Sequence, residues 1–311
     1  MKWIRSTTFH WLMGGLGIGG SVYCLIRFGQ WRHLSWPGTP FLLLSVSLVL
    51  LEMACRAERL KRVTPLVGTP ISFWESVWVN ALGDIYGAAT PSSFGGEVSR
   101  LASLTRLGLT GSGAMVTLAI ERFALLLSLA TVMILSVLIL LVKNPALLSV
   151  RSLLLTFLLY VGFSIGLVIF MIVAIRLKKI EARWHELTLR PDILGLAMVH
   201  HGIRLSFLPL SLWFLAGADF SPMIFIWSFI LSYGVALLPI PSGGGSMELT
   251  FLALFKPMFG GIRAAATLVW WRLLSHYLYV FISLLVAIAG MIHLAPRRGL
   301  LIPLAKKEEI A

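Results

Sequence analysis

The chain has 311 residues, of which 58% are hydrophobic and only 13% charged, and its mean hydropathy is +0.90. Soluble domains carry roughly 25% charged residues, so the composition excludes an ordinary soluble fold and indicates a helical membrane protein with spans of about 20 residues. The net charge is +13, but the basic residues cluster between apolar runs, which favours cytoplasmic loops and anionic lipid head groups over nucleic acid as their partners.

The predicted elements begin with a span at about residues 7–26, which we interpret as a retained anchor helix. A second span follows at about 39–55. Four basic residues within 56–62 come directly after it, and they predict a cytoplasmic loop because such loops are enriched in lysine and arginine.

The region 63–112 is predicted to have both of its ends on the cytoplasmic side. The spans after it, at about 113–142 and 152–175, run outward and back to a second basic segment. "TPSSFGG" at 90–96 interrupts the region, so we predict a re-entrant helical hairpin with this sequence at its tip. The stretch 98–110 is amphipathic, which is typical of an interfacial helix and also suits a binding element.

The second half repeats this organisation. A span at about 192–216 is followed by a second break, "PIPSGGG" at 239–245, and by a last span at about 262–292. The basic residues after the last span predict that the end of this span lies on the cytoplasmic side. The second hairpin is therefore predicted to enter the membrane from the outside. We expect one transmembrane domain over 1–296 and a cytoplasmic tail at 297–311, with both termini in the cytoplasm.

These elements predict an all-α polytopic membrane protein with about six transmembrane helices and two oppositely oriented re-entrant hairpins. An internal repeat supports this fold: shifted by 150 residues, 91–122 matches 241–272 at nine of 32 positions without gaps. Chance gives roughly two or three matches in so biased a composition. We therefore predict an inverted repeat with halves at about 39–175 and 192–292.

Paired interrupted segments in inverted halves are the pattern of a transporter whose substrate site lies near the middle of the membrane. Irregular backbone is tolerated there only where protein buries it or a water-filled cavity meets it, so we predict one shared polar cavity. Helix starts at the breaks would offer backbone N–H groups to an anion, although close helix packing is an alternative role for the glycines. The helix-breaking prolines are Pro91, Pro239 and Pro241, and the candidate binding residues of the breaks are Ser92, Gly95, Gly96, Ser242, Gly243, Gly244 and Gly245.

Arg122 and Arg272 occupy equivalent positions of the repeat, inside predicted spans where a charge is costly. Because a guanidinium can donate two parallel bonds to phosphate, we predict that each half supplies one arginine to a lipid phosphate. A structural ion pair with a glutamate is the alternative for Arg122. Glu121 is expected to pair with another cation, to balance the arginines or to carry a proton. The other charged candidates for substrate binding are Glu97, Arg100 and Glu248, with Asp84 deeper in the first hairpin.

At these residues the sequence resembles the transmembrane, flippase-type region of lysylphosphatidylglycerol synthases and the stand-alone membrane proteins related to it. The family pattern P-x-x-x-G-G-[DE] corresponds to 91–97, its E-R pair to 121–122, and its P-x-P-G-G-x-G…E pattern to 239–248. The resemblance extends over roughly 7–292. Ser242 departs from the family's usual glycine and Glu97 from its usual aspartate, so the identity of the lipid does not carry over.

The resemblance implies a lipid flippase, because in full-length relatives this region moves an aminoacylated phosphatidylglycerol from the inner to the outer leaflet. The soluble domain that attaches the amino acid in those relatives has no counterpart in this sequence, so we expect a transporter rather than an enzyme. The expected substrate is an anionic phospholipid or a polyprenyl-phosphate-type lipid.

The residues by themselves are also compatible with other functions. Carboxylates such as Glu97 could serve an intramembrane lipid-modifying enzyme, for example a lipid-linked glycosyl- or phosphotransferase, and a non-catalytic scaffold is a third hypothesis. The sequence predicts no cofactor and no metal site, and it leaves the oligomeric state undetermined. Without an ATP-binding loop, uphill transport would require coupling to protons or another ion. We expect the protein in a bacterial or archaeal cell membrane.

Overall fold

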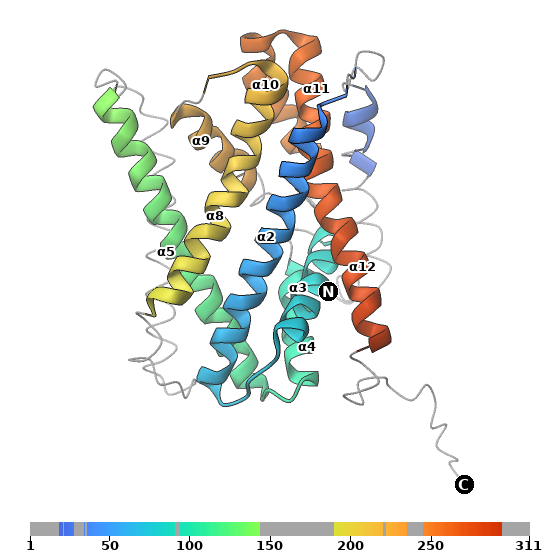
Figure 1. Cartoon of the computed structure of the whole chain (residues 1–311), viewed down its shortest axis with the longest axis vertical. Helices are drawn as coiled ribbons and strands as arrows, with labels where there is room; N and C mark the ends of the chain where they lie inside the picture. The colour runs from blue at the N-terminus through green and yellow to red at the C-terminus, as the bar shows by residue number, and fades with distance from the viewer. Residues whose placement is uncertain are drawn as a thin grey trace, which may run out of the picture.

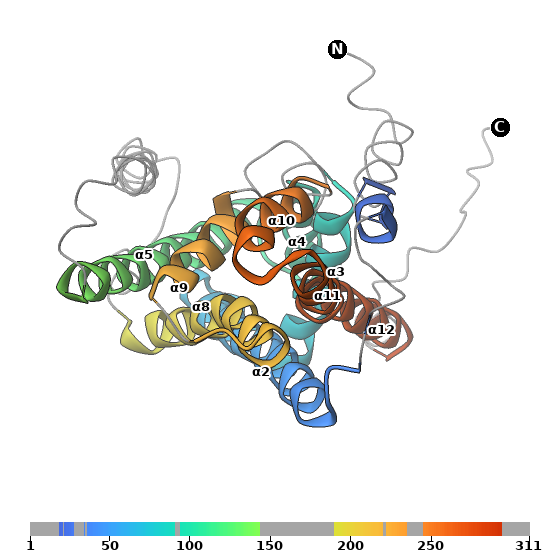
Figure 2. The ribbon, with the colours of Figure 1, turned by 90° about the horizontal axis from the view of Figure 1, so that it is seen from above.

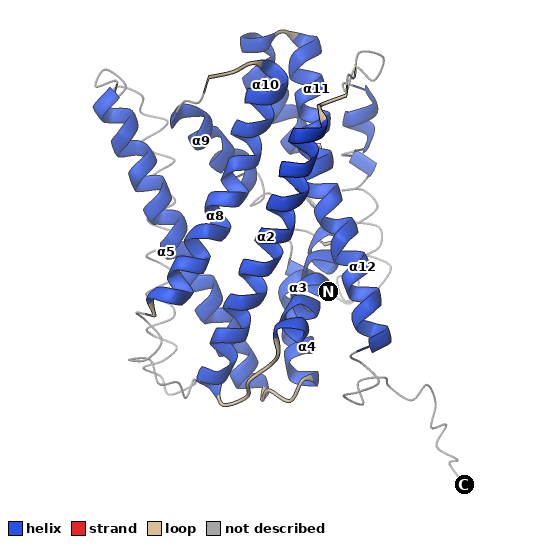
Figure 3. Ribbon diagram, viewed as in Figure 1, coloured by secondary structure: helices blue, strands red, loops and turns tan. Residues whose placement is uncertain are grey.

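The computed structural model describes residues 19–20, 22–27, 34, 36–90, 94–143, 190–219, 222–234 and 245–293, and all regular structure in these ranges is helical (Figure 3). This confirms the predicted all-α fold. The predicted span at 152–175 and the tail at 297–311 lie outside the described residues. So do Pro91, Ser92, Pro239, Pro241 and the residues Ser242, Gly243 and Gly244.

Within the described residues, four helical segments are long and apolar enough to cross a membrane, namely Thr39–Val67, Gly111–Val132, Pro191–Ala216 and Gly261–His293. The first is helix α2 (Thr39–Val63) with the short 3-10 turn η3 (Thr64–Val67), and the second belongs to α5 (Gly111–Lys143). The third is α8 (Pro191–Ser211) with the π-helical turn η6 (Leu212–Ala216). The fourth joins α11 (Gly261–Arg272), η10 (Leu273–Tyr277) and α12 (Leu278–His293).

Helix α2 is longer than the sequence predicted. The basic stretch at 56–62, expected as a cytoplasmic loop, continues the helix to Val63, and the Arg59 side chain inside it is only 1% exposed. The prediction of a loop was wrong because the charges of Arg56 and Arg59 are neutralised by carboxylates of other helices, which allows this part of α2 to lie inside the bundle.

Two pairs of shorter helices lie at opposite ends of the bundle (Figure 1). Helices α3 (Phe73–Ala88) and α4 (Phe94–Arg106) form a hairpin in the lower half, next to the lower part of α5. Helices α9 (Pro222–Phe229, continued by η7 at Ile230–Gly234) and α10 (Ser246–Phe259) lie in the upper half. Seen from above, α10 lies over the region of α4, whereas α9 lies to one side, against α5 and α8 (Figure 2).

Glycine residues allow helices α3 and α4 of the hairpin to pack closely against each other. A Cβ atom built on Gly96 would lie only 2.5 Å from the Gly83 carbonyl oxygen, and one on Gly95 would lie 2.6 Å from Cγ2 of Thr90. The start of α3 is fixed by a capping box in which Ser72 and Glu75 bond to each other's backbone N–H groups. The backbones of α3 and α4 therefore approach more closely than side chains with a Cβ would allow.

Helix α12 packs along α3 and completes the lower half. At Gly290 a built Cβ would lie 2.0 Å from Cδ1 of Trp78, so the indole ring occupies the space that a side chain at position 290 would need. The largest apolar cluster lies above this region and joins α2, α8, α10 and α11 through residues such as Val49, Phe251 and Leu268.

Candidate functional site

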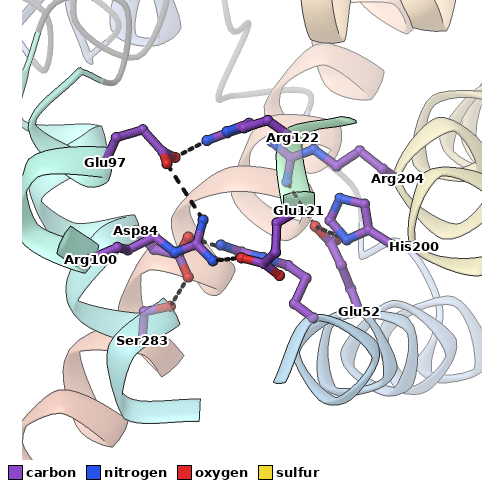
Figure 4. A network of polar contacts seen from close by, with 10 residues as sticks. Glu52, Asp84, Glu97, Arg100, Glu121, Arg122, His200, Arg204 and Ser283 are labelled. Atoms are coloured by element: carbon purple, nitrogen blue, oxygen red, sulfur yellow. Dashed lines mark hydrogen bonds and ion pairs between the residues drawn. The ribbon is translucent and has the colours of Figure 1, made fainter. Parts of the chain in front are cut away.

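Ten polar side chains from five helices gather inside the bundle, and most of them are labelled in Figure 4. We call them the central polar cluster: Glu52, Arg56 and Arg59 of α2, Asp84 of α3, Glu97 and Arg100 of α4, Glu121 and Arg122 of α5, and His200 and Arg204 of α8.

Glu121 connects three helices. Its side chain is fully buried, and one carboxylate oxygen accepts a bond from Arg59 Nε at 3.1 Å while the other accepts a bond from Nη2 of Arg100. Arg59 and Arg100 are themselves buried, at 1% and 4% exposure. A carboxylate out of water needs such pairing because its desolvation costs several kcal/mol, on the order of the attraction it gains. Glu121 thus ties α2 and α4 to α5.

Arg122 follows Glu121 in the chain but points in another direction, toward Glu97 at the start of α4 (Figure 4). Glu97 also lies 3.6 Å from Nη1 of Arg100. The Arg122 side chain is 53% exposed and that of Glu97 is 30% exposed, whereas Arg59, Arg100 and Glu121 are buried. The Arg122–Glu97 pair is therefore the accessible part of the network around Glu121.

The opposite side of the cluster is organised by α2. Arg56 donates to Asp84 at 2.8 Å, and the hydroxyl of Ser283 donates to the other Asp84 oxygen at 3.2 Å. The guanidinium carbons of Arg56 and Arg204 lie 5.6 and 5.8 Å from the centre of the Tyr279 ring. Both distances are within the range of a cation–π contact, so this aromatic ring holds two arginines of different helices.

Arg204 comes from the middle of α8. Its Nη1 lies 3.4 Å from Oε1 of Glu52, which is a long hydrogen bond, and its side chain is 30% exposed. The Glu52 side chain is 2% exposed. Arg204 thus combines partial exposure with a long hydrogen bond to its carboxylate, and it is the second partly exposed arginine of the cluster after Arg122.

A separate ion pair lies at the second break. Arg272 Nε donates to Glu248 Oε1 at 2.7 Å, and both side chains are almost completely buried. The other Glu248 oxygen accepts the backbone N–H of Gly245 at 2.8 Å, at a position where the φ angle of Gly245 is +82°. Glycine tolerates this left-handed conformation without strain, so Gly245 sets the start of α10 and Glu248 caps it.

The charges of the central polar cluster do not cancel. Within the described residues it contains five arginines and four carboxylates, which leaves one positive charge when all carboxylates are ionised. The Arg272–Glu248 pair is balanced by itself. One excess cation in a bundle of apolar helices is the charge that a single phosphodiester anion would neutralise.

The structure brings the predicted charged residues together within each half. Glu97, Arg100, Glu121 and Arg122 are joined in one network, and Glu248, Arg272 and Gly245 in another. Of the three roles left open for Glu121, pairing with other cations is confirmed. The close-packing role of the glycines is confirmed for Gly95 and Gly96. Whether these residues contact a substrate stays a prediction.

Arg56, Arg59, Arg204, Glu52 and His200 were not predicted. Arg56 and Arg59 belong to a basic run that was assigned to a loop, which concealed them. Arg204 lies in the middle of a predicted span, so the argument that singled out Arg122, the cost of a charge in a membrane, would have found it. Glu52 could have been found in the same way.

Metal binding finds no support in the described ranges, where no group of three or more histidine, cysteine, aspartate or glutamate side chains is placed to hold an ion. His201 uses its Nε2 in a 2.9 Å hydrogen bond with the Leu125 carbonyl.

A search of curated proteins found no similar sequence. The family described as lysylphosphatidylglycerol synthase TM region matches residues 4–283, which includes every residue of the central polar cluster and the Arg272–Glu248 pair. The resemblance seen in the motifs is thereby confirmed over most of the chain, and the chain belongs to the family of the lysylphosphatidylglycerol synthase transmembrane region.

Proposed function

We propose that this protein is a lipid flippase that moves an anionic phospholipid or polyprenyl-phosphate-type lipid between the membrane leaflets. The observation that carries the proposal is the one uncompensated positive charge of the central polar cluster, together with the partial exposure of Arg122 and Arg204. A phosphate head group supplies one negative charge and several acceptor oxygens, and arginine is the side chain best shaped to bind it.

In this proposal Arg122 is the first contact of the head group. Its present partner, Glu97, is partly exposed and can be displaced by a phosphate oxygen, whereas Glu121 is fixed by two buried arginines. Arg204 supplies a second guanidinium from α8. The phosphate would pass between these arginines while the acyl or prenyl chains stay in the surrounding lipid.

The helical pairs support a transport role. Helices α3–α4 lie toward one end of the bundle and α9–α10 toward the other, as expected of two re-entrant hairpins in an inverted repeat (Figure 1). With the predicted spans outside the described residues, the protein would have about six transmembrane helices. Both termini would lie in the cytoplasm of a bacterial or archaeal cell.

The structure changes the prediction for Arg272. Its guanidinium is held by Glu248 at 2.7 Å, with Sδ of Met247 at 3.2 Å, in a site that is 2% exposed. We propose that Arg272 positions the second break and that Arg204 replaces it as the partner of Arg122. Substrate contact by Arg272 would require Glu248 to lose a buried partner, which is costly.

The test is the transfer of fluorescent anionic and zwitterionic phospholipids between leaflets of proteoliposomes, for wild type, Arg122→Ala and Arg204→Ala. We expect each substitution to slow the transfer of the anionic lipid at least about tenfold, because a charge-assisted hydrogen bond contributes roughly 1.5–3 kcal/mol. Arg106→Ala is the matched control, because Arg106 is an exposed arginine on α4 outside the cluster.

Transfer that survives both cluster substitutions would discard this site while keeping the flippase. Absence of transfer for every anionic lipid, with and without a proton gradient, would overturn the proposed function. Recovery of chemically altered lipid from the same vesicles would instead support the lipid-modifying enzyme.

A further inference from the structure

Oε2 of Glu52 and Nδ1 of His200 are among the buried polar atoms of the central polar cluster that have no hydrogen-bond partner in the described residues. Glu52 is 1% exposed and His200 is 8% exposed. The two side chains face each other from α2 and α8 (Figure 4), with Nδ1 of His200 4.0 Å from Oε1 of Glu52, too far for a hydrogen bond.

The chemistry of these atoms accounts for both being unsatisfied in one tautomer of His200. An ionised carboxylate oxygen only accepts hydrogen bonds, and when the neutral imidazole carries its proton on Nε2, its Nδ1 also only accepts. Two acceptors cannot bond to each other, and each buried acceptor without a donor costs free energy. One proton on the carboxyl group would turn Glu52 into a donor, and a small rotation would then satisfy both atoms with a single O–H···N bond.

The charges around Glu52 come from every element that packs against it. Arg56 lies one turn further along α2, Arg204 faces it from α8, and Asp84 faces it from α3. Tyr279 of α12 lies against both arginines. Glu121 of α5 is ion-paired with Arg59, the next arginine along α2. Two further titratable groups lie near this site, His201 beside His200 and His276 near Arg204. Of the two carboxylates on this side, Asp84 has a close ionic partner, Arg56, at 2.8 Å, whereas Arg204 is 3.4 Å from Glu52.

We propose that Glu52 and His200 form a proton-binding site in which the Glu52 carboxyl group takes up one proton from solvent and donates it in a hydrogen bond to Nδ1 of His200. Neutralising Glu52 removes the anion that engages Arg204 and adds one positive charge to the cluster. This consequence rests on the flippase proposed above: proton uptake raises the affinity for a lipid phosphate, and binding of the phosphate raises the affinity for the proton by the same factor.

The proton site is tested without any transport, by infrared difference spectroscopy of the purified protein between about pH 9 and about pH 5. We expect the band of a protonated carboxyl group to appear as the pH falls, to be lost in Glu52→Gln, and to persist in Glu58→Gln. Glu58 is the matched control because it lies on the same helix and is paired with Lys61 and Arg62 at the surface.

His200→Phe supplies a second reading if Glu52→Gln does not fold. Phenylalanine fills a similar volume but cannot accept a hydrogen bond, so the carboxyl band is expected to move to higher frequency. A wild type without a protonated carboxyl band over this pH range, or a band unaffected by both substitutions, would overturn the proton site.

The coupling to lipid has its own measurement. In proteoliposomes, wild-type transfer of the anionic phospholipid is expected to rise as the pH falls, by at most about tenfold per pH unit for one proton. Glu52→Gln, which stays neutral, is expected to transfer equally well at every pH. Identical pH dependence in the wild type and in Glu52→Gln would overturn the coupling. If no lipid is transferred at all, the proposed function fails while the infrared result still decides the proton site.

Discussion

Arg272 and Glu248 form a buried ion pair, with Nε 2.7 Å from Oε1, and they stand 24 residues apart in the second half of the chain. Arg122 and Glu97 form the corresponding pair of the first half, 25 residues apart. In both halves an arginine of a long helix thus bonds to the carboxylate that follows a glycine break. The two pairs differ in surroundings, because the first is partly exposed and the second is buried.

This difference predicts unequal effects of removing the arginines. Arg272→Ala leaves the Glu248 carboxylate buried without its cation and is expected to lower the free energy of unfolding by about 3–5 kcal/mol. Arg122→Ala removes a partly exposed partner and is expected to cost about 0–1 kcal/mol. Unfolding of both variants in a denaturant titration, followed by tryptophan fluorescence, measures the two losses. Equal losses would contradict the assignment of Arg272 to a positioning role.

Glu121 is expected to be the most sensitive carboxylate of the cluster. Glu121→Gln leaves Arg59 and Arg100 without their shared counter-charge inside the bundle, and we expect a loss of about 3–5 kcal/mol in the free energy of unfolding. Glu58→Gln removes a surface pair of the same residue types and is expected to cost less than about 1 kcal/mol. A Glu121→Gln protein as stable as Glu58→Gln would show that the three-helix connection is unimportant for folding.

Gly96→Ala tests the closeness of the α3–α4 hairpin. The added methyl group would lie 2.5 Å from the Gly83 carbonyl oxygen, so the helices must separate, at an expected cost of about 1–3 kcal/mol. Gly195→Ala on α8 is the control, since no atom lies within 4 Å of its added Cβ, and it is expected to be neutral or to stabilise by up to about 1 kcal/mol. Thermal unfolding of the two variants in detergent compares them directly, and equal unfolding temperatures would contradict the close approach.

Substitutions of Tyr279 separate the contribution of its aromatic ring to stability from that of its hydroxyl group. Its hydroxyl is buried and has no hydrogen-bond partner among the described residues, so Tyr279→Phe is expected to leave the stability unchanged or slightly raised. Tyr279→Leu also removes the ring that faces Arg56 and Arg204 and is expected to cost about 1–2 kcal/mol relative to the phenylalanine variant. If the two variants unfold at the same denaturant concentration, the cation–π contacts contribute nothing.

Much of the fold could be predicted from hydropathy, and the four spans of the described residues agree with apolar runs of the sequence. The end of α2 could not be predicted in this way. A run such as 56–62 is usually a loop, and only the contacts of Arg56 with Asp84 and of Arg59 with Glu121 keep it inside the bundle. Hydropathy measures the cost of a charge but contains no information about its partner on another helix.

Only part of the candidate site could be predicted, again because the sequence pattern contains no information about contacts between helices. The repeat identified Arg122 and Arg272 as equivalent, and both are paired with a glutamate, although Glu97 and Glu248 are offset by one residue in the register of the repeat. The exposure of the two arginines cannot be derived from the repeat, because it depends on how α5 and α11 pack against their neighbours. Arg204 has no charged counterpart in the matched segments, so a search guided by the repeat could not reach it.

The partners of α2 also determine the order in which the protein can be assembled. Arg56, Arg59 and Glu52 are paired with residues that lie 28, 62 and 152 positions later in the chain. A ribosome therefore delivers α2 to the membrane with three charges whose partners do not yet exist, and each is expensive to expose to lipid. We therefore expect helix α2 to reach its final position only after α8 has been synthesised, with water, the insertion machinery or a chaperone shielding its charges until then.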